Sequence, residues 1–144
     1  MYKLLLLFLC AGIGASAQET LMLRSPSVSN NKIAFAYGGD VWVAERDGSH
    51  ALRLTVNPGV EANPQLSPDG KWIAFTANYD GNGDVYIIPS SGGSPKRLTF
   101  HPGDDLVRGW DSNDKIIFAS TRQVPLSLMM QLFEVNVNTS LEQM

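Results

Sequence analysis

A pattern that recurs about every 44 residues constrains the fold of this chain more than any other feature of its sequence. Two copies contain the same three short segments in the same order, namely Lys32–Phe35 and Lys71–Phe75, Gly39–Val43 and Gly83–Ile87, and Arg53–Thr55 and Arg97–Thr99. A third copy begins at Gly109, and we align its Lys115–Ala119 with Lys71–Phe75, again 44 positions apart. Repetition with this period indicates that one small structural unit is used several times.

The segment from residue 63 to residue 99 is the best-marked copy, because three turn signals divide it into four short apolar runs. The turns are Ser67–Gly70, Asp80–Gly83 and Ser91–Ser94. In the first turn, Pro68 presets the backbone angle of the second position and Gly70 occupies the fourth, as a type I turn prefers. Four strands of roughly 4–6 residues joined by hairpins predict a small antiparallel meander.

A repeat in the low forties with four strands per unit is typical of a β-propeller blade. Large apolar residues alternate with small ones in one strand of each copy, as expected for sheets packed between neighbours: Ile33, Phe35, Ile73, Phe75, Ile116 and Phe118. The predicted fold class is therefore all-β, a partial β-propeller with two complete four-stranded antiparallel blades and most of a third. The predicted blade borders are about 21–58, 59–102 and 103–144.

Propellers close with typically 4–8 blades, so about two and a half blades leave a ring incomplete. We therefore expect the first and last sheets to expose apolar surface and an unpaired edge. The third copy stops at Met144, before its predicted fourth strand, and it carries an apolar insertion, Val124–Met130, that predicts a loop across the propeller face or a short helical turn. The simplest expectation is that the chain is the N-terminal piece of a longer protein.

The first 17 residues have the features of a secretory signal peptide. A short positive start is followed by an apolar run from Leu4 to Ala15, and Ala15–Ala17 forms a small-x-small cleavage signal. A lipoprotein signal would use Cys10, but Leu9 stands where that processing needs a small residue. We therefore expect the mature chain 18–144 to be exported, either periplasmic or secreted, and to contain no membrane segment.

Cleavage removes the single cysteine together with Lys3, so ten basic and 14 acidic residues remain and the net charge is −4. The mature chain must then be held together by packing without disulfides. Its basic residues are scattered singly, and the acidic balance argues against a nucleic-acid surface. No nucleic-acid partner is expected.

Motifs for catalysis or metal binding are incomplete. Asp80, Asn82 and Asp84 imitate the start of an EF-hand loop, but Val85 replaces the required glycine and Ser91 replaces the bidentate glutamate. Asp84 is predicted instead to cap a hairpin through backbone N–H groups. The two histidines have no partner at metal-ligand spacing, and no serine lies in a Gly-x-Ser-x-Gly elbow. We predict no catalytic residue, no cofactor site and no metal site in this chain.

One acidic set remains a candidate for binding. The loop between the second and third strands of a blade and the loop that enters the innermost strand lie on the same face of a propeller. Residues from these two kinds of loop are predicted to contact peptides at the channel mouth: Glu61, Tyr79, Asp80, Asp104 and Asp105. An acidic rim would favour cationic peptide termini. The alternative interpretation is that these are solvated turn residues.

Specific motifs in all three copies carry a family resemblance. They are Pro26–Ser29 with Lys32–Val43, Gly59–Pro64 with Phe75–Asn82, and His101–Gly103 with Val107–Trp110. These segments resemble the first blades of tricorn-type proteases. The combination of Glu-x-Asn-Pro with Asn-Tyr-Asp-Gly-Asn is more specific than the Ser-Pro-Asp-Gly turn, which many propellers carry. The resemblance covers nearly all of the mature chain.

The resemblance implies the N-terminal propeller of a large exported or cytosolic peptidase that acts on peptides and is a homo-oligomer at full length. A second propeller, a PDZ domain and a serine-peptidase core with a Ser-His-Ser-Glu arrangement would follow, and propeller channels would guide peptides to or from that core. None of the core lies in these residues, so no catalytic position can be carried over.

Two alternatives stay open at this stage. The chain could be a non-enzymatic periplasmic propeller similar to the Tol-system translocation protein, although that type has an α/β domain before its propeller, whereas blade one starts soon after Gln18. It could also be the propeller of a prolyl-oligopeptidase-like enzyme, in which case a Gly-x-Ser-x-Gly elbow would follow beyond the end.

Overall fold

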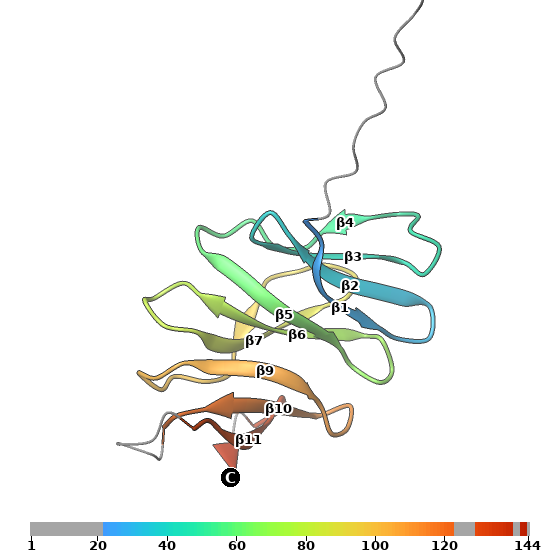
Figure 1. The fold of residues 1–144 in the computed structure, drawn as a ribbon. Coiled ribbons are helices and arrows are strands. Elements are labelled where there is room, and N and C mark those ends of the chain that lie inside the picture. Colours follow the sequence, from blue (N-terminus) through green and yellow to red (C-terminus); the bar gives the residue numbers. More distant parts are fainter. Residues whose placement is uncertain (1–21, 123–128, 140–141, 144) are drawn as a thin grey trace, which may run out of the picture.

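The computed structural model describes residues 22–122, 129–139 and 142–143, and every regular element within these ranges is a β-strand (Figure 1). The strands form three four-stranded antiparallel sheets. The first sheet contains β1 (Arg24–Val28), β2 (Lys32–Tyr37), β3 (Asp40–Glu45) and β4 (Leu52–Arg53). The second contains β5 (Val60–Leu66), β6 (Trp72–Asn78), β7 (Asp84–Pro89) and β8 (Lys96–Arg97). The third contains β9 (Asp105–Trp110), β10 (Lys115–Ser120), β11 (Gln131–Asn136) and β12 (Glu142–Gln143).

Each sheet is one blade, and its strands follow one another in chain order from the inner strand to the outer one. The inner strand β5 contacts the inner strands β1 and β9 on either side of it, so the three blades are arranged side by side (Figure 1). The predicted all-β propeller architecture is confirmed. The signal peptide and residues 124–128 of the predicted insertion lie outside the described residues.

The third blade differs from its prediction because it has a fourth strand. Residues Glu142–Gln143 pair with β11 through Val135 and Glu134. The outer strands of the first two blades are also only two residues long. A strand this short carries no alternation that a sequence pattern can reveal, which is why the third copy looked incomplete.

The register of the third blade also corrects the sequence alignment by one residue. Glu61 pairs with Ala77, and its repeat equivalent Asp105 pairs with Ser120, an offset of 43 rather than 44 between β6 and β10. Phe118, and not Ala119, is therefore the counterpart of Phe75. The alignment was anchored on exposed lysines, whereas strand register is fixed by the residues that must be buried.

The core lies between the sheets rather than inside any one of them. One cluster joins blades 1 and 2, where Ala34, Val41 and Val43 pack against the opposing face of the second sheet. A second cluster joins blades 2 and 3 in the same way. At each junction the receiving sheet presents two stacked rings, Phe75 with Tyr86 and Phe118 with Phe133, with centroids 5.9 and 5.7 Å apart. Repeated burial of equivalent side chains explains why the blades form from similar segments.

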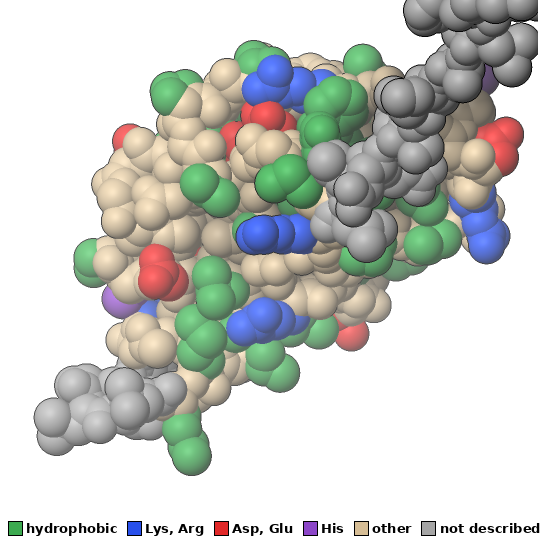
Figure 2. Space-filling view, turned by 45° about the horizontal axis from the view of Figure 1, so that its top comes forward, with side chains coloured by type: hydrophobic (Ala, Val, Ile, Leu, Met, Phe, Trp, Pro, Cys, Tyr) green, Lys and Arg blue, Asp and Glu red, His purple; other side chains and the backbone are tan. Residues whose placement is uncertain are grey.

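Blade surfaces that have no neighbouring blade are partly exposed, as predicted. Leu132 on β11 is 63% exposed, whereas Val41 and Val85 at the equivalent positions are fully covered by the next blade. Val28 on β1 is 58% exposed. On the face shown in Figure 2, hydrophobic side chains appear at several separate places rather than as one continuous patch.

Candidate functional site at the blade junctions

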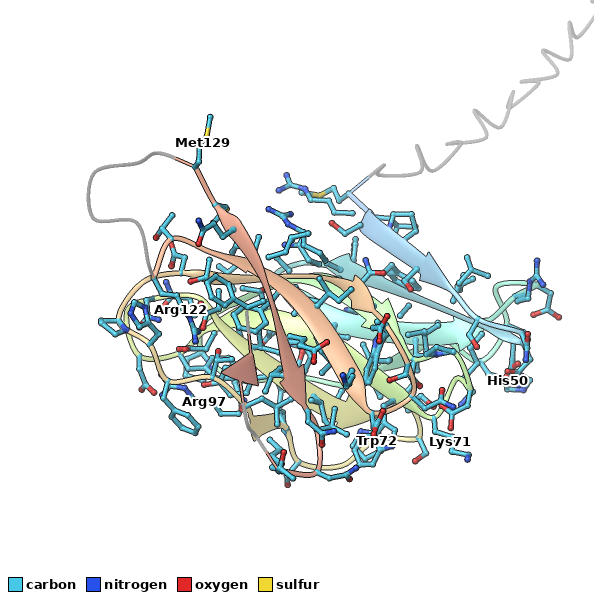
Figure 3. All side chains as sticks on the ribbon, turned by 90° about the horizontal axis from the view of Figure 1, so that it is seen from below. His50, Lys71, Trp72, Arg97, Arg122 and Met129 are labelled. Carbon is cyan, nitrogen blue, oxygen red and sulfur yellow. The ribbon has the colours of Figure 1, made fainter. Side chains whose placement is uncertain are left out.

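The turns and loops that were predicted to share one face do meet there. The amide of Glu61, at the start of β5, donates to the carbonyl of Gly39 in the β2–β3 turn at 2.8 Å. The amide of Asp105, at the start of β9, donates to the carbonyl of Gly83 in the β6–β7 turn at 2.7 Å. Each inner strand is therefore tied at this face to the preceding blade. Figure 3 shows Arg97 and Arg122 at this end of the blades, with Lys71 and Trp72 at the other end.

Glu61 lies beneath the surface at the junction of blades 1 and 2, where it is 2% exposed. Its carboxylate accepts a hydrogen bond from the hydroxyl of Tyr79 at 2.6 Å and another from the hydroxyl of Thr55 at 2.9 Å. Burial raises the pKa of Glu61 above its ordinary value, and the two hydroxyl donors offset only part of that effect. Burial and the Glu61 carboxylate also raise the pKa of the Tyr79 phenol.

Asp105 takes the same position at the junction of blades 2 and 3, but its partner is a cation. Its Oδ2 pairs with the guanidinium of Arg122, and the side chains of these residues are 0% and 9% exposed. Arg122 also lies over the rings of Phe118 and Phe133, at 5.0 and 5.3 Å from their centroids. Oδ1 of Asp105 is buried without a hydrogen-bond partner in the described part of the chain.

The repeated Gly-Asp-Val and Arg-Leu-Thr segments build the frame around these two carboxylates. In blade 1, Arg53 pairs with Asp40 at 2.8 Å and the Thr55 hydroxyl accepts the amide of Val41 at 2.9 Å. In blade 2, the equivalent contacts join Arg97 with Asp84, at 2.7 Å, and Thr99 with the amide of Val85, at 2.9 Å.

This frame corrects the prediction for Asp84. Its side chain does not cap a hairpin through backbone N–H groups; it accepts from Arg97, from the Thr99 hydroxyl at 3.4 Å and from the side-chain amide of Asn82 at 3.3 Å. The carboxylate is 1% exposed, and burial raises its pKa even though Arg97 opposes that effect. Pairing between β7 and β8 brings the arginine to it, which spacing along the chain could not show.

The predicted peptide-contact residues therefore occupy different depths. Asp80 and Asp104 are exposed, Tyr79 is half-buried, and Glu61 and Asp105 are buried. Asp80 pairs with Arg97 at 2.8 Å, and Asp104 accepts the amide of Gly83 at 2.8 Å. The structure brings the five residues to one face but does not place all their carboxylates at the surface. Peptide contact at these residues stays a prediction.

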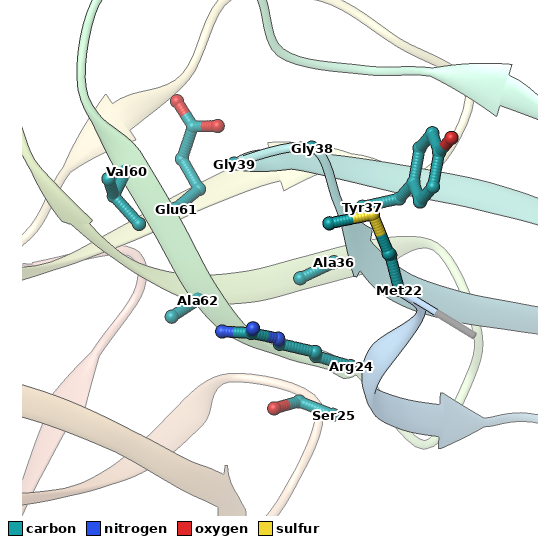
Figure 4. Close-up of a pocket in the computed structure, with 10 residues that line it drawn as sticks. All are labelled: Met22, Arg24, Ser25, Ala36, Tyr37, Gly38, Gly39, Val60, Glu61 and Ala62. Atoms are coloured by element: carbon teal, nitrogen blue, oxygen red, sulfur yellow. The ribbon is translucent and has the colours of Figure 1, made fainter. Parts of the chain in front are cut away.

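A hollow of about 300 Å³ lies beside Glu61 between β1 and β5 (Figure 4). Small residues and larger side chains, including two charged ones, line it together: Met22, Arg24, Ser25, Ala36, Tyr37, Gly38, Gly39, Val60, Glu61 and Ala62. Figure 4 shows Arg24 extending toward β5 and the carboxylate of Glu61 pointing away from it. No sequence pattern predicts this hollow, because its lining comes from β1, β2 and the β2–β3 turn together with β5, which follows much later in the chain.

Within the described ranges, the contacts of the two histidines do not form a catalytic or metal-binding arrangement. Ser49 and His50 are in hydrogen-bond contact at 3.0 Å, but both lie in the β3–β4 turn, and the Asp47 carboxylate accepts the amide of Ser49 rather than orienting the imidazole. His101 accepts the amide of Gly103 through Nδ1 at 2.9 Å. No group of three His, Cys, Asp or Glu side chains there could hold a metal ion, and no helix there is long and apolar enough to cross a membrane.

Comparison with known families decides what kind of propeller this is. A family model described as the Tricorn protease N-terminal beta propeller domain matches residues 20–144. The chain belongs to this family. The tricorn resemblance seen in the sequence motifs is thus confirmed, and at the family level it is favoured over the Tol-type and prolyl-oligopeptidase-type alternatives.

Individual relatives agree with the tricorn assignment. The chain is 32% identical over 118 residues to the putative Tricorn-like protease N-terminal subunit of Sulfurisphaera tokodaii, covering 78% of this chain and 60% of that protein. It superposes on the crystal structure of the tricorn protease with a TM-score of 0.69 and 25% identity, covering 79% of this chain and 12% of that one. A putative TolB from Agrobacterium tumefaciens gives a TM-score of 0.73 at 20% identity, covering 88% and 50%, which shows a shared fold.

The tricorn-type propeller described here therefore spans only part of the proteins that it matches. Within it, the two junction carboxylates sit at equivalent repeat positions, one bonded to hydroxyls and the other to a guanidinium. The sequence signal that identifies them as equivalents is their 44-residue separation, which is the same as the separation of Asp40 from Asp84.

Proposed function

We propose that this chain is the propeller segment of an exported tricorn-like serine peptidase. In this proposal it scaffolds the assembly and controls the access of peptides to a catalytic domain outside these residues. The observation that carries the proposal is the match of residues 20–144 to the tricorn N-terminal propeller family. The similarity to a tricorn-like N-terminal subunit and to the tricorn protease structure supports a parent peptidase.

The arrangement of the loop face supports a gating role. Strands β5 and β9 are held at this face by hydrogen bonds to the preceding blade, and a hollow opens beside β5 that is lined in part by Gly38, Gly39 and Ala62. A surface of this kind can accept an extended chain through backbone groups without demanding one sequence. Exposed Val60 lies at its rim, next to buried Glu61.

The test uses the complete protein that contains this propeller. Val60→Trp would narrow the hollow, and Leu52→Trp on outer strand β4 is the matched control, since Leu52 is 47% exposed and does not line the hollow. We expect V60W to lower kcat/KM for long peptides by about tenfold while a short chromogenic substrate is cleaved normally. Absence of peptidase activity in the complete protein, or equal loss with both substrates, would contradict the proposal.

Export is a separate part of the proposal and rests on the first 17 residues. Expression in a bacterial host should yield a mature protein that begins at Gln18, measured by intact mass in the periplasmic or culture fraction. An unprocessed Met1 terminus in the cytoplasm would contradict it. Association of the full-length protein with copies of itself is proposed from the family and is checked by light scattering.

A propeller that binds partner proteins without a peptidase is the second candidate, favoured by the fold likeness to the putative TolB. Capture of an outer-membrane lipoprotein by the complete protein, together with an absence of peptide cleavage, would favour this candidate over the first.

A further inference from the structure

The junction of blades 1 and 2 contains a buried carboxylate to which no cation of the described residues is bonded. Glu61 is 2% exposed, and both of its oxygens accept from hydroxyl groups, those of Tyr79 and Thr55. Asp105 at the next junction has the same backbone bond to the preceding turn but is paired with Arg122. One junction is therefore held by an ion pair and the other by a carboxyl group whose charge has no direct compensation.

The charged and titratable groups around Glu61 do not supply that compensation. The Arg53 charge on β4 favours ionisation of Glu61, but Arg53 is bonded to Asp40 on β3, whose charge has the larger and opposite effect on Glu61. Arg24 on β1 lines the same hollow but is exposed, and Figure 4 shows the Glu61 carboxylate pointing away from it. The remaining groups are two phenols, Tyr79 and Tyr86, which contact each other with centroids 4.9 Å apart. An ionised carboxylate that is buried in this way carries a large desolvation penalty.

We propose that Glu61 is a proton-operated latch between blades 1 and 2, closed when its carboxyl group is protonated and loosened when it is ionised. From the start of β5, Glu61 contacts Gly39 in the β2–β3 turn, Thr55 in the segment after β4 and Tyr79 in the β6–β7 loop. The latch is a property of the propeller and does not depend on the proposed peptidase.

The second blade offers a precedent for the hydrogen bonds that the protonated state would use. There the hydroxyl of Thr99 accepts the amide of Val85 and donates to Asp84. If the equivalent Thr55 hydroxyl turns toward Asp40, its oxygen becomes free to accept the proton on Oε2 of Glu61. Tyr79 then continues to donate to Oε1. Protonation thus exchanges one donor for another and removes the buried charge.

The direction of the pH dependence follows from linkage. The pKa of Glu61 is raised by folding above its ordinary value of 4.5, so the folded junction binds the proton more tightly than the open one. Protonation of Glu61 stabilises the junction fully at pH values below 4.5. This stabilisation is lost as the pH rises through the pKa of Glu61 in the folded state, and above that pKa the stability of the junction no longer changes with pH. The opening constant of the junction increases by up to about tenfold per pH unit within this window.

Amide hydrogen exchange of the full chain between pH 4 and pH 8 tests the proposal with an internal control. After correction for intrinsic exchange, opening at the amides of Glu61 and Val41 should increase with pH relative to the equivalent amides of Asp105 and Val85. Glu61→Gln keeps the shape of the side chain and removes the titration of Glu61, so in this variant the ratio should no longer increase with pH. A pH-dependent ratio that persists unchanged in E61Q would overturn the proposal.

A second variant keeps the test decisive if E61Q does not fold. Tyr79→Phe removes a hydrogen bond that lowers the pKa of Glu61, so it should shift the midpoint of the exchange transition to higher pH. The ¹³C resonance of the Glu61 carboxyl group should titrate with the same midpoint as the exchange ratio. A Glu61 resonance that titrates at or below 4.5 would overturn the latch without any variant.

Discussion

The two blade junctions use the same backbone frame but neutralise their buried carboxylates differently. At the junction of blades 2 and 3, Arg122 pairs with Asp105, and both side chains are almost fully buried. At the junction of blades 1 and 2, Glu61 relies on Tyr79 and Thr55. The difference teaches that a repeat can preserve its geometry while changing its electrostatics, so equivalent residues need not respond equally to mutation or pH.

The largest expected effect is at the ion-paired junction. Arg122→Ala leaves Asp105 buried without its cation, and loss of one partner from a buried pair should destabilise the chain by about 3–5 kcal/mol. Urea denaturation of the full chain measures this effect. The double variant Arg122→Met with Asp105→Asn, which removes both charges, should recover most of the loss. If Arg122→Ala destabilises the chain by less than Arg97→Ala or Arg53→Ala does, the contrast between the two junctions is wrong.

The second-largest expected effect comes from the space around two equivalent glycines, one at each junction. Gly59 and Gly103 are repeat equivalents, but a Cβ at Gly59 would lie 2.5 Å from the carbonyl oxygen of Asn78 and 2.8 Å from the ring of Tyr79, at φ +157°. A Cβ at Gly103 would meet the His101 ring at 3.2 Å. Gly59→Ala should therefore cost about 2–3 kcal/mol, and Gly103→Ala should cost clearly less. Thermal denaturation of both variants checks this order, which equal melting temperatures would contradict.

The outer arginines provide a smaller test, because they differ in exposure. Arg97 is 23% exposed and bonds Asp84, which is nearly inaccessible to solvent, whereas Arg53 is 46% exposed and bonds a more accessible Asp40. Arg97→Ala should cost about 2 kcal/mol, and Arg53→Ala should cost less than about 1 kcal/mol because solvent screens the exposed pair. Repeating urea denaturation at high salt should reduce the R53A effect further. A larger cost for R53A would show that exposure does not govern these pairs.

The last comparison concerns the hydroxyl-bonded junction, where the expected effect is smaller than that of Arg97→Ala. Tyr79→Phe removes the hydrogen bond to Glu61 and should destabilise the chain at pH 7 by about 1–2 kcal/mol. Tyr37→Phe is the matched control, since the Tyr37 ring contacts Trp42 edge-on and is retained in phenylalanine. Guanidinium denaturation of both variants should separate them. Equal stabilities would mean that the Tyr79 hydroxyl contributes nothing to this junction.

The sequence alone was sufficient for the architecture because the repeat encodes it directly. Gly-Asp-Val and Arg-Leu-Thr recur because each pair of segments builds one Asp–Arg contact and one Thr–amide contact. The turn at Ser67–Gly70 was also predictable, and Gly70 adopts φ +71° and donates its amide to Ser67. The fourth strand of blade 3 was not predictable, because two residues are too few to show a pattern.

The candidate site was predicted only as a set of neighbouring loops. Chain order correctly brings Glu61, Tyr79, Asp80, Asp104 and Asp105 to one face, since propeller topology fixes which loops meet. Burial of Glu61 and Asp105 could not be read from residue types, which suggested a solvated acidic rim. Their depth depends on how closely adjacent sheets pack, and this is determined by side chains from other blades.

What the sequence determined by itself is local and periodic: the strands, the turns, the three blades and the tricorn-type family, because each is written in short segments at a fixed spacing. Only the tertiary structure decided which carboxylate meets a cation. Arg122 reaches Asp105 because β10 pairs with β9, whereas Glu61 meets hydroxyl groups from the preceding blade and from the β6–β7 loop. The physical reason is that a desolvated charge responds to every group packed around it, and those groups are brought together from distant parts of the chain.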